Sequence, residues 1–241
     1  VLVGKAVTFD TGGISLKPGQ GMDEMKFDKC GGCTVLGIMK SVSELKLPIN
    51  VVGIIPSVEN MPGGEAYRPG DIIKLYNGKT AEILNTDAEG RLILADALAY
   101  GEKQYTPKVI IDFATLTGAC IVALGNNVAA IVSNDKQLTK EITNSSKTTT
   151  EEVWELPLTQ DYMDMIKSDV ADIKNVGIGK AAGTITAAAF LKSAIKDTPW
   201  VHFDIAGVAW TQGAATKQKP YNPKGATGFG VRLILDYLQK L

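Results

Sequence analysis

The chain has 241 residues, of which 45% are apolar and 21% are charged, a composition typical of a globular domain. Its formal net charge of −1 excludes binding to nucleic acid or to an anionic membrane through bulk positive charge. No apolar run reaches the roughly 18 residues of a membrane-spanning helix. We therefore expect one α/β domain with no nucleic-acid partner and no membrane association.

Apolar runs alternate with loops and helical patterns along the first half of the chain. The sequence predicts, in order, a buried strand at 1–10, a helix at 31–47, a buried strand at 49–55, an irregular loop at 59–70, a hairpin at 71–84 with an Asn77-Gly78 turn, and a helix at 93–100. The chain begins inside an apolar strand and without a methionine. We therefore expect it to be a piece of a longer protein whose N-terminal portion is missing.

The same alternation continues through the second half. The sequence predicts strands at 109–116, 129–132 and 201–206, helices at 135–147, 159–167, 184–195 and 229–241, a glycine-rich loop at 178–183 and a long polar loop at 213–228. Strands that alternate with helices favour an α/β fold with a mixed, mostly parallel central sheet and helices on both faces. With no internal repeat or linker in the sequence, we assign 1–241 to a single domain.

The three cysteines, Cys30, Cys33 and Cys120, are too few for a disulfide scaffold and favour a reducing, cytoplasmic environment. Cys30 and Cys33 form a C-x-x-C pair, but the chain has no second pair and only one histidine, His202. A zinc site of the usual cysteine–histidine kind cannot be completed from these residues. We interpret the pair as small residues packed at a helix start, and His202 as a packed core residue without a catalytic role.

Two acids lie together where a strand passes into a helix. Asp87 and Glu89 follow the apolar run 81–84 and precede the helix predicted at 93–100. Residues two apart in an extended segment point the same way, so both carboxylates can reach one point, with Arg91 close behind. This edge of an α/β sheet is where ligand sites are usually built. Carboxylates held this close repel each other, and the segment therefore predicts a metal site.

Two further acids occupy similar junctions, because Asp10 ends the first strand and Asp28 precedes a helix. Together with Asp87 and Glu89 they provide four carboxylates, enough to hold two divalent ions whose charge offsets the repulsion. Oxygen ligands suit Mg²⁺ or Mn²⁺, and zinc also accepts carboxylates.

Two lysines, Lys5 and Lys17, fall in the same region, and the sequence allows two positions for each side chain. Lys5 lies five residues before Asp10, so the two side chains point to opposite faces of an ideal strand. A bend or bulge is required if both reach one site; otherwise Lys5 extends along the edge of the protein to water. Lys17 follows a glycine-rich turn and lies either in the site or on a mobile surface.

Taken in order, these segments resemble the leucyl aminopeptidase family of dinuclear zinc exopeptidases. The resemblance covers the whole chain, corresponds to the family's C-terminal catalytic domain, and rests on Val3-Gly4-Lys5-x-x-Thr8-Phe9-Asp10-x-Gly12-Gly13-x-x-x-Lys17, Met22-x-x-Met25-Lys26-x-Asp28, Asn60-Met61-Pro62-Gly63-Gly64, Asn85-Thr86-Asp87-Ala88-Glu89-Gly90-Arg91-Leu92 and Thr115-Leu116-Thr117-Gly118-Ala119. Ala6, Cys30 and Cys33 depart from the family's usual residues, at positions that are not ligands. The family's N-terminal domain is not part of this chain.

The resemblance implies a metal centre with two ions. One ion would be held by Lys5 through its neutral amine, Asp10, Asp28 and Glu89; the other, exchangeable, would be held by Asp10, Glu89 and Asp87 with its main-chain carbonyl. Zn²⁺ is the expected metal, with Mn²⁺, Co²⁺ or Mg²⁺ as alternatives at the exchangeable site. Such a pair of ions activates a water molecule for attack on a peptide bond, and Lys17 matches the residue that stabilises the oxyanion.

The resemblance also implies where a proton carrier and the substrate bind. Arg91, with Gly90 and Leu92, matches a bicarbonate site in which the anion moves the proton; the alternative for Arg91 is an ion pair with Asp87 or Glu89. The substrate's free amine would meet Asp28. Its first side chain, leucine-like or otherwise bulky and apolar, would contact Met25, Thr115, Leu116, Gly118, Ala206 and Ala209, and the small Ala209 predicts a roomy floor.

The most direct functional hypothesis is therefore a metal-dependent aminopeptidase acting on peptides. A two-metal phosphoesterase is a second possibility, since carboxylate clusters also serve phosphoryl transfer, and a DNA-binding or scaffold role is a third. Members of the family are hexamers of two-domain subunits. We accordingly expect a hexamer for the full-length protein, and a fragment that is inactive in isolation is a fourth possibility.

Overall fold

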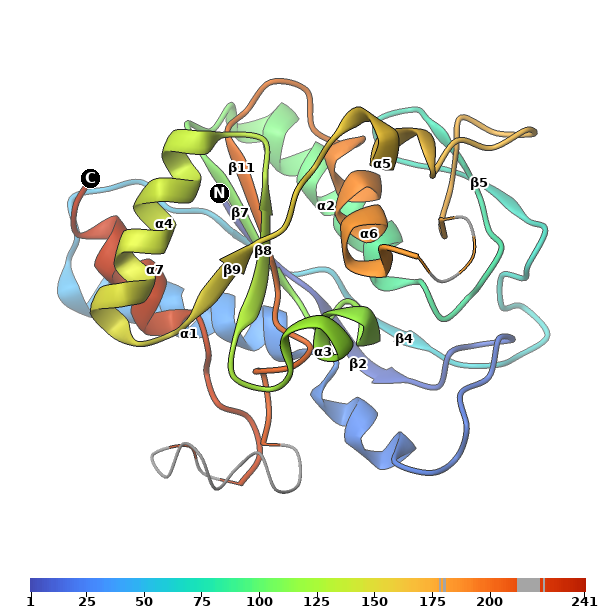
Figure 1. The fold of residues 1–241 in the computed structure, drawn as a ribbon, viewed down its shortest axis with the longest axis horizontal. Coiled ribbons are helices and arrows are strands. Elements are labelled where there is room, and N and C mark those ends of the chain that lie inside the picture. The colour runs from blue at the N-terminus through green and yellow to red at the C-terminus, as the bar shows by residue number, and fades with distance from the viewer. Residues whose placement is uncertain (178, 180, 212–221, 223) are drawn as a thin grey trace.

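The computed structural model describes residues 1–177, 179, 181–211, 222 and 224–241. A six-stranded sheet lies at its centre (Figure 1). Its order is β3 (Gly53–Ile54), β1 (Leu2–Gly4), β7 (Ile110–Ala114), β11 (Trp200–Asp204), β8 (Ala129–Ser133) and β9 (Val153–Glu155). Every neighbouring pair is parallel except β11 and β8. The prediction of a mixed, mostly parallel sheet is confirmed.

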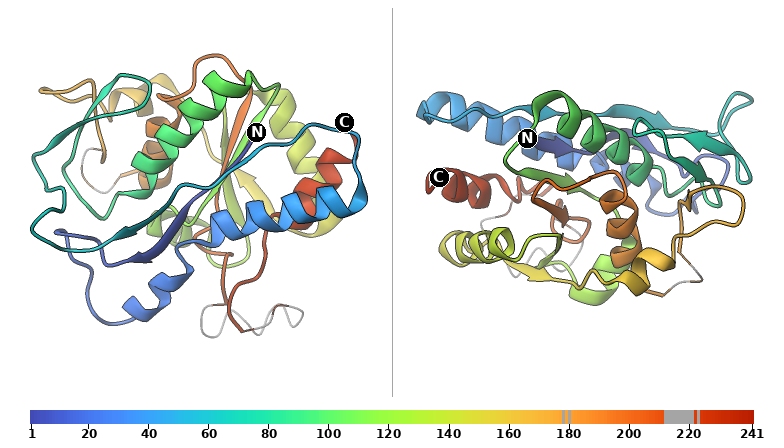
Figure 2. Two further views of the ribbon diagram at one scale, coloured as in Figure 1. Left: turned by 180° about the vertical axis from the view of Figure 1, so that it is seen from behind. Right: turned by 90° about the horizontal axis from the view of Figure 1, so that it is seen from above.

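Helices cover both faces of this sheet, as the view from above in Figure 2 shows. One face carries α1 (Cys30–Leu45), α4 (Lys136–Thr149) and α7 (Val231–Leu238), and the other carries α2 (Gly90–Tyr105) and α6 (Gly183–Lys192). Alternate residues of β11 point to the two faces of the sheet. Val201 and Phe203 pack in the apolar core beneath α1, α4 and α7, and Trp200 packs in the core beneath α2 and α6. Burial of apolar side chains on both faces is the main stabilising contribution.

Two smaller sheets carry segments that lead to the acids. In one, β2 (Ala6–Asp10) pairs in parallel with β4 (Ser57–Asn60); in the other, β6 (Thr80–Glu82) lies between β10 (Ile173–Lys174) and β5 (Ile72–Lys74). The antiparallel pairing of β5 with β6 confirms the predicted hairpin. At its turn, Gly78 has φ 91°, a conformation that favours glycine.

The prediction of one strand over 1–10 is wrong, because the segment forms two strands that belong to different sheets. The backbone N–H of Lys5 still bonds to the carbonyl of Phe113 in β7 at 2.9 Å, whereas β2 pairs with β4. The register of that pairing shifts between Val7 and Asp10. Lys5 lies at the junction of β1 and β2, and the required bend is therefore present.

Other boundaries also differ from the predictions. Only Gly53–Ile54 of the run 49–55 forms a strand, and it is a partly exposed edge of the sheet, so the predicted burial is wrong. The segment expected to begin a loop at 59 instead ends β4, because pairing with β2 orders it. The structure adds η1 (Met22–Phe27), α3 (Gly118–Leu124), β9 and β10, and shortens the helix at 159–167 to α5 (Gln160–Asp164).

The loop predicted at 213–228 falls largely outside the described residues. Of the loop predicted at 178–183, residues 179, 181 and 182 are described outside any helix or strand, and Gly183 already begins α6. Helix α2 begins at Gly90, three residues before the predicted start, so the end of the acidic segment forms its first turn. Within the described part of the chain, no helix combines the length and the apolar character needed to cross a membrane.

Candidate metal centre

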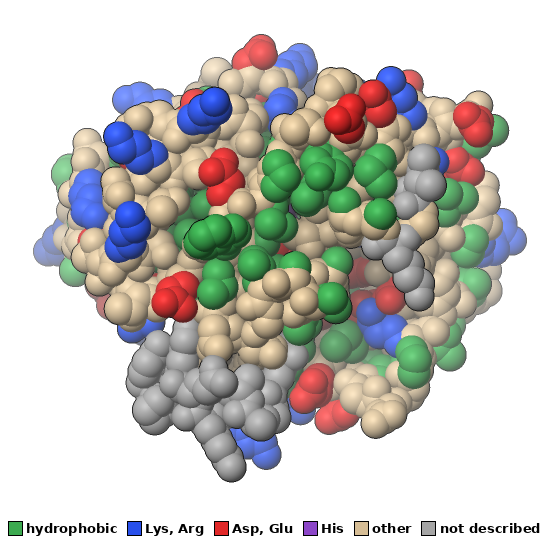
Figure 3. Space-filling model, viewed as in Figure 1, with side chains coloured by type: hydrophobic (Ala, Val, Ile, Leu, Met, Phe, Trp, Pro, Cys, Tyr) green, Lys and Arg blue, Asp and Glu red, His purple; other side chains and the backbone are tan. Residues whose placement is uncertain are grey.

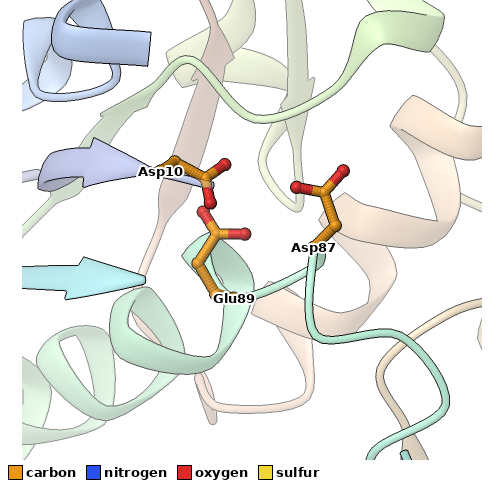
Figure 4. A group of neighbouring side chains, drawn as sticks. All are labelled: Asp10, Asp87 and Glu89. Atoms are coloured by element: carbon orange, nitrogen blue, oxygen red, sulfur yellow. The ribbon is translucent and has the colours of Figure 1, made fainter. Parts of the chain in front are cut away.

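Three carboxylates converge at the carboxyl end of β2. Asp10 closes that strand, Asp87 lies in the loop after β6, and Glu89 is the residue that precedes α2. Figure 4 shows the three side chains coming from these separate elements toward one region. One oxygen from each lies within 4.8 Å of the others, close enough for all three to bind one cation. The predicted convergence of Asp87 and Glu89 with Asp10 is therefore present.

Lys5 and Asp28 complete the buried side of this cluster. The Lys5 amine lies 2.8 Å from Asp28 Oδ2 and 2.7 Å from Glu89 Oε1, and it donates to the carbonyl of Thr115 at 3.1 Å. Lys5 is only 3% exposed, so the alternative in which it extends to water is wrong. The Thr115 hydroxyl donates to Asp28 Oδ1 at 2.6 Å, which ties the end of β7 to the centre.

Lys17 lies on the more open side of the cluster. Its amine is 3.0 Å from Asp10 Oδ2 and also forms an ion pair with Asp87. With 22% of its side chain exposed, it is the cation of the cluster that solvent can reach. The structure thus places both predicted lysines against the predicted acids, one buried and one accessible.

Polar residues for which the sequence predicts no role hold the acids in place. The Asn60 amide donates to Asp10 Oδ1 at 2.9 Å and to the carbonyl of Thr86 at 3.0 Å. The Thr86 hydroxyl donates to the carbonyl of Gly12 at 2.6 Å, and the Tyr67 hydroxyl donates to the Thr86 carbonyl at 2.8 Å. These bonds link the loop after β2 to the loop after β6, and they span 19 to 74 residues of sequence.

The carboxylates of the cluster outnumber the ammonium groups that contact them. Asp28 and Glu89 pair with Lys5, and Asp10 and Asp87 pair with Lys17. Burial raises the pKa of the Asp28 carboxyl to about 7, with Lys5 opposing the rise and Glu89 adding to it. Burial also raises the pKa of Asp87, against the effect of Lys17. For Lys5, burial favours the neutral amine, but Asp28 and Glu89 outweigh it and raise the pKa.

Three buried oxygen atoms support the fit of this donor set to metal ions. Among the described residues, Asp28 Oδ2, Asp87 Oδ1 and Glu89 Oε1 accept no hydrogen bond of normal geometry, and each is balanced by an ion pair with Lys5 or Lys17. Buried acceptors normally accept hydrogen bonds, so a group of oxygens that face cations instead suits a bound cation. Figure 3 shows acidic and basic side chains side by side in a hollow on this side of the molecule. The carboxylate oxygens match the preferences of Mg²⁺ and Mn²⁺ and are accepted by Zn²⁺.

Arg91 lies beside the acids but forms no ion pair with Asp87 or Glu89 among the described residues. Its guanidinium is buried; one Nη donates to the carbonyl of Asn175 at 2.8 Å, and Nε has no hydrogen-bond partner among the described residues. Burial lowers the pKa of Arg91 to about 10, with Glu89 and Asp204 opposing the shift. A buried guanidinium with a free N–H is suited to an anion.

The residues predicted to contact a substrate lie on several elements. Met25 is in η1 just before Asp28, Thr115 and Leu116 follow β7, and Gly118 begins α3. Ala206 and Ala209 follow β11, which pairs with β7, so they leave the same edge of the sheet. Both alanines are buried.

His202 is fully buried on β11, as expected, but it is not surrounded only by apolar atoms. Its Nδ1 lies 2.6 Å from Asp112 Oδ1, and the Trp200 indole donates to Asp112 Oδ2 at 2.7 Å. Burial favours the neutral imidazole, but Asp112 outweighs it and raises the pKa of His202. No sequence pattern predicts this pairing, because Asp112 lies 90 residues away.

The fold and the site together define a class: a mixed α/β domain with a cluster of carboxylates and lysines that could hold divalent metal ions. Residues 1–235 match the family model described as the cytosol aminopeptidase family, catalytic domain, and the chain belongs to this family. The predicted resemblance to the leucyl aminopeptidases is thereby confirmed.

Individual relatives agree with this assignment. The chain is 77% identical over 239 residues to a probable cytosol aminopeptidase of Cenarchaeum symbiosum and 54% identical over 241 residues to one of Desulfotalea psychrophila; these alignments cover 99% and 100% of the chain but 49% and 47% of those proteins. The crystal structure of the cytosol aminopeptidase from Coxiella burnetii matches 99% of the chain and 51% of its own length, with 43% identity and a TM-score of 0.92. The chain therefore spans about half the length of these relatives.

Proposed function

We propose that this chain is the catalytic domain of a metal-dependent aminopeptidase that removes the N-terminal residue from peptides. The observation that carries the proposal is one continuous cluster: Asp28 and Glu89 contact the buried amine of Lys5, and Glu89 shares a possible cation site with Asp10 and Asp87. Family membership supports it.

The residues around the centre fit two metal ions. Lys5, Asp10, Asp28 and Glu89 would hold one ion, and Asp10, Asp87 and Glu89 would hold the other. Bound there, divalent ions supply an activated water molecule and polarise the scissile carbonyl. We propose Zn²⁺ as the resident metal, with Mn²⁺, Co²⁺ or Mg²⁺ able to replace it at the site of Asp87.

The protein's own groups would do the remaining work. Asp28 can accept a hydrogen bond from the substrate's free amine, which restricts the reaction to the first residue of a peptide. Lys17, the accessible cation, would donate to the oxyanion that develops on the carbonyl. Arg91, whose buried Nε has no hydrogen-bond partner in the part of the chain that the structure describes, would hold bicarbonate together with Gly90 and Leu92, and the anion would supply a proton-transfer group.

We propose that the preferred substrates carry a leucine-like or other bulky apolar first residue. Met25, Thr115, Leu116, Gly118, Ala206 and Ala209 would line that subsite. Rates for leucine, phenylalanine and tryptophan anilides, measured on the wild type and on Ala209→Met, test the floor of the subsite. The larger side chain should reduce the phenylalanine and tryptophan rates most, and an unchanged preference would remove Ala209 from the subsite.

The activity itself is tested with leucine p-nitroanilide, its N-acetylated form and a phosphate ester. Hydrolysis of the free-amine anilide alone, abolished by a chelator and restored by Zn²⁺ or Mn²⁺, is expected. Hydrolysis of the phosphate ester instead would favour the two-metal phosphoesterase.

Assembly is a separate proposal. We propose that the full-length protein is a hexamer that works in the cytoplasm, by analogy with the family. Sedimentation of the 241-residue chain beside its activity would show whether this part of the protein works alone. A stable, active monomer would contradict the need for assembly.

A further inference from the structure

Asn175 is a buried residue that contacts the loop between β6 and α2, which carries Asp87 and Glu89. It follows directly after β10 and has no exposed surface. Its side-chain oxygen accepts from the N–H of Leu84 at 2.8 Å and of Asn85 at 3.4 Å. Its side-chain nitrogen donates to the carbonyl of Asn85 at 2.6 Å and of Ala88 at 3.5 Å. The oxygen and the NH₂ group of the amide are thus both used on one loop.

The main chain of Asn175 also bonds to both ends of the segment that its side chain contacts. Its N–H donates to the carbonyl of Glu82, the last residue of β6, at 2.9 Å. Its carbonyl accepts from the guanidinium of Arg91 at 2.8 Å. One residue therefore bonds to the segment from its start at Glu82 to Arg91 in the first turn of α2.

These bonds matter because the segment between β6 and α2 has no ladder of its own. Backbone groups in buried irregular segments need partners, and here a side chain 87 to 91 residues away supplies several of them. The segment carries Asp87 and Glu89, whose orientation decides how cations are held. Groups that orient metal ligands commonly contribute 10–100-fold to metal affinity or activity.

We propose that Asn175 is a positioning residue that holds Asp87, Glu89 and Arg91 in a fixed arrangement, so that metal affinity and the use of an anion by Arg91 depend on the same buried residue. The assignment of these three residues to a metal and an anion rests on the proposed function. The coupling through Asn175 rests on the hydrogen bonds alone.

Two variants separate the parts of the amide. Asn175→Ala removes all side-chain bonds to the loop. Asn175→Asp keeps the volume and the acceptor, but it turns a second oxygen toward the carbonyls of Asn85 and Ala88. Mn²⁺ titrated into metal-free protein by calorimetry should bind about 10–100-fold more weakly to either variant. Stimulation of activity by bicarbonate should fall in the same variants.

The matched control is Asn134→Ala. Asn134 also bonds to backbone on both sides of its amide, to the carbonyl of Thr198 and the N–H of Trp200, but it lies after β8, away from the centre. Its removal should leave Mn²⁺ affinity within about twofold of the wild type, at a smaller cost to stability because Asn134 is exposed.

Amide hydrogen exchange of residues 84–91 provides a readout that does not depend on activity. These amides should exchange faster in both Asn175 variants, while those of β11 stay protected. Wild-type Mn²⁺ affinity in a folded Asn175→Ala variant would overturn the proposal, and if that variant does not fold, Asn175→Asp decides in the same way. A wild type that binds Mn²⁺ without cleaving any anilide would contradict the proposed function and leave this test valid.

Discussion

The side chain of Lys5 passes directly across Gly90, the first residue of α2. A Cβ at position 90 would lie 2.5 Å from Cε and 2.7 Å from Nζ of Lys5. The glycine is thus required for space and leaves the amine free to reach Asp28 and Glu89.

Gly90→Ala should displace the Lys5 amine while the fold persists. We expect an overpacking cost of about 1–3 kcal/mol and a loss of metal affinity of at least about tenfold. Metal titration by calorimetry and thermal unfolding of the metal-free protein measure the two effects. Gly63→Ala is the control, because a Cβ there meets nothing within 4 Å; equal metal affinity in both variants would contradict the role of the close approach.

Lys5→Met should strongly destabilise the metal-free protein. The substitution removes the cation between Asp28 and Glu89 and leaves two buried carboxylates uncompensated, a change that costs about 3–5 kcal/mol. Urea unfolding in the presence of a chelator measures it. Lys40→Met, which removes an exposed pair with Glu44, should cause no measurable change. A loss from Lys5→Met as small as that of the control would show that the Lys5 amine is not needed.

Lys17→Met should leave metal content unchanged and slow the chemical step. If Lys17 stabilises the oxyanion, kcat falls about 10²–10³-fold, whereas KM changes much less because the substrate amine is held elsewhere. Steady-state kinetics with leucine p-nitroanilide and metal analysis of the same samples measure both. A kcat within threefold of the wild type would exclude Lys17 from that role.

His202 should titrate above its ordinary pKa of about 6.5. Burial and the charge of Arg91 oppose its proton, but Asp112 and Asp204 retain it. As the protein's only histidine, it gives a single imidazole signal, so NMR reads its midpoint directly. In Asp112→Asn the midpoint should drop below that of the wild type, and a wild-type midpoint at or below 6.5 would contradict the pairing.

The same shift predicts a pH dependence of stability. Because the folded protein holds the His202 proton more tightly than the unfolded chain, this contribution is complete below pH 6.5. It is lost as pH rises through the raised pKa of the folded protein. Urea unfolding at several pH values should show a smaller decline above pH 6.5 in Asp112→Asn than in the wild type.

Local sequence patterns predicted much of the fold and identified the charged residues of the candidate site. Apolar runs and helical periodicity predicted the central strands and most helices, and the order of Lys5, Asp10, Asp28 and the segment 85–92 pointed to the family. These features depend on residues that are close together in the sequence, so they can be predicted without a structure. The split of 1–10 into β1 and β2 was missed, since the same apolar run suits one long strand or two short ones.

The sequence by itself determined which groups we propose for the chemistry: four carboxylates, two lysines and one arginine at strand and helix ends. Only the tertiary structure decided how they meet. It buried Lys5 between Asp28 and Glu89, passed its stem over Gly90, and brought Asn60 and Asn175 to loops tens of residues away. The physical reason is that hydrogen bonds and close approaches between distant segments depend on packing, and a hydrophobic pattern fixes only which face of each element is buried.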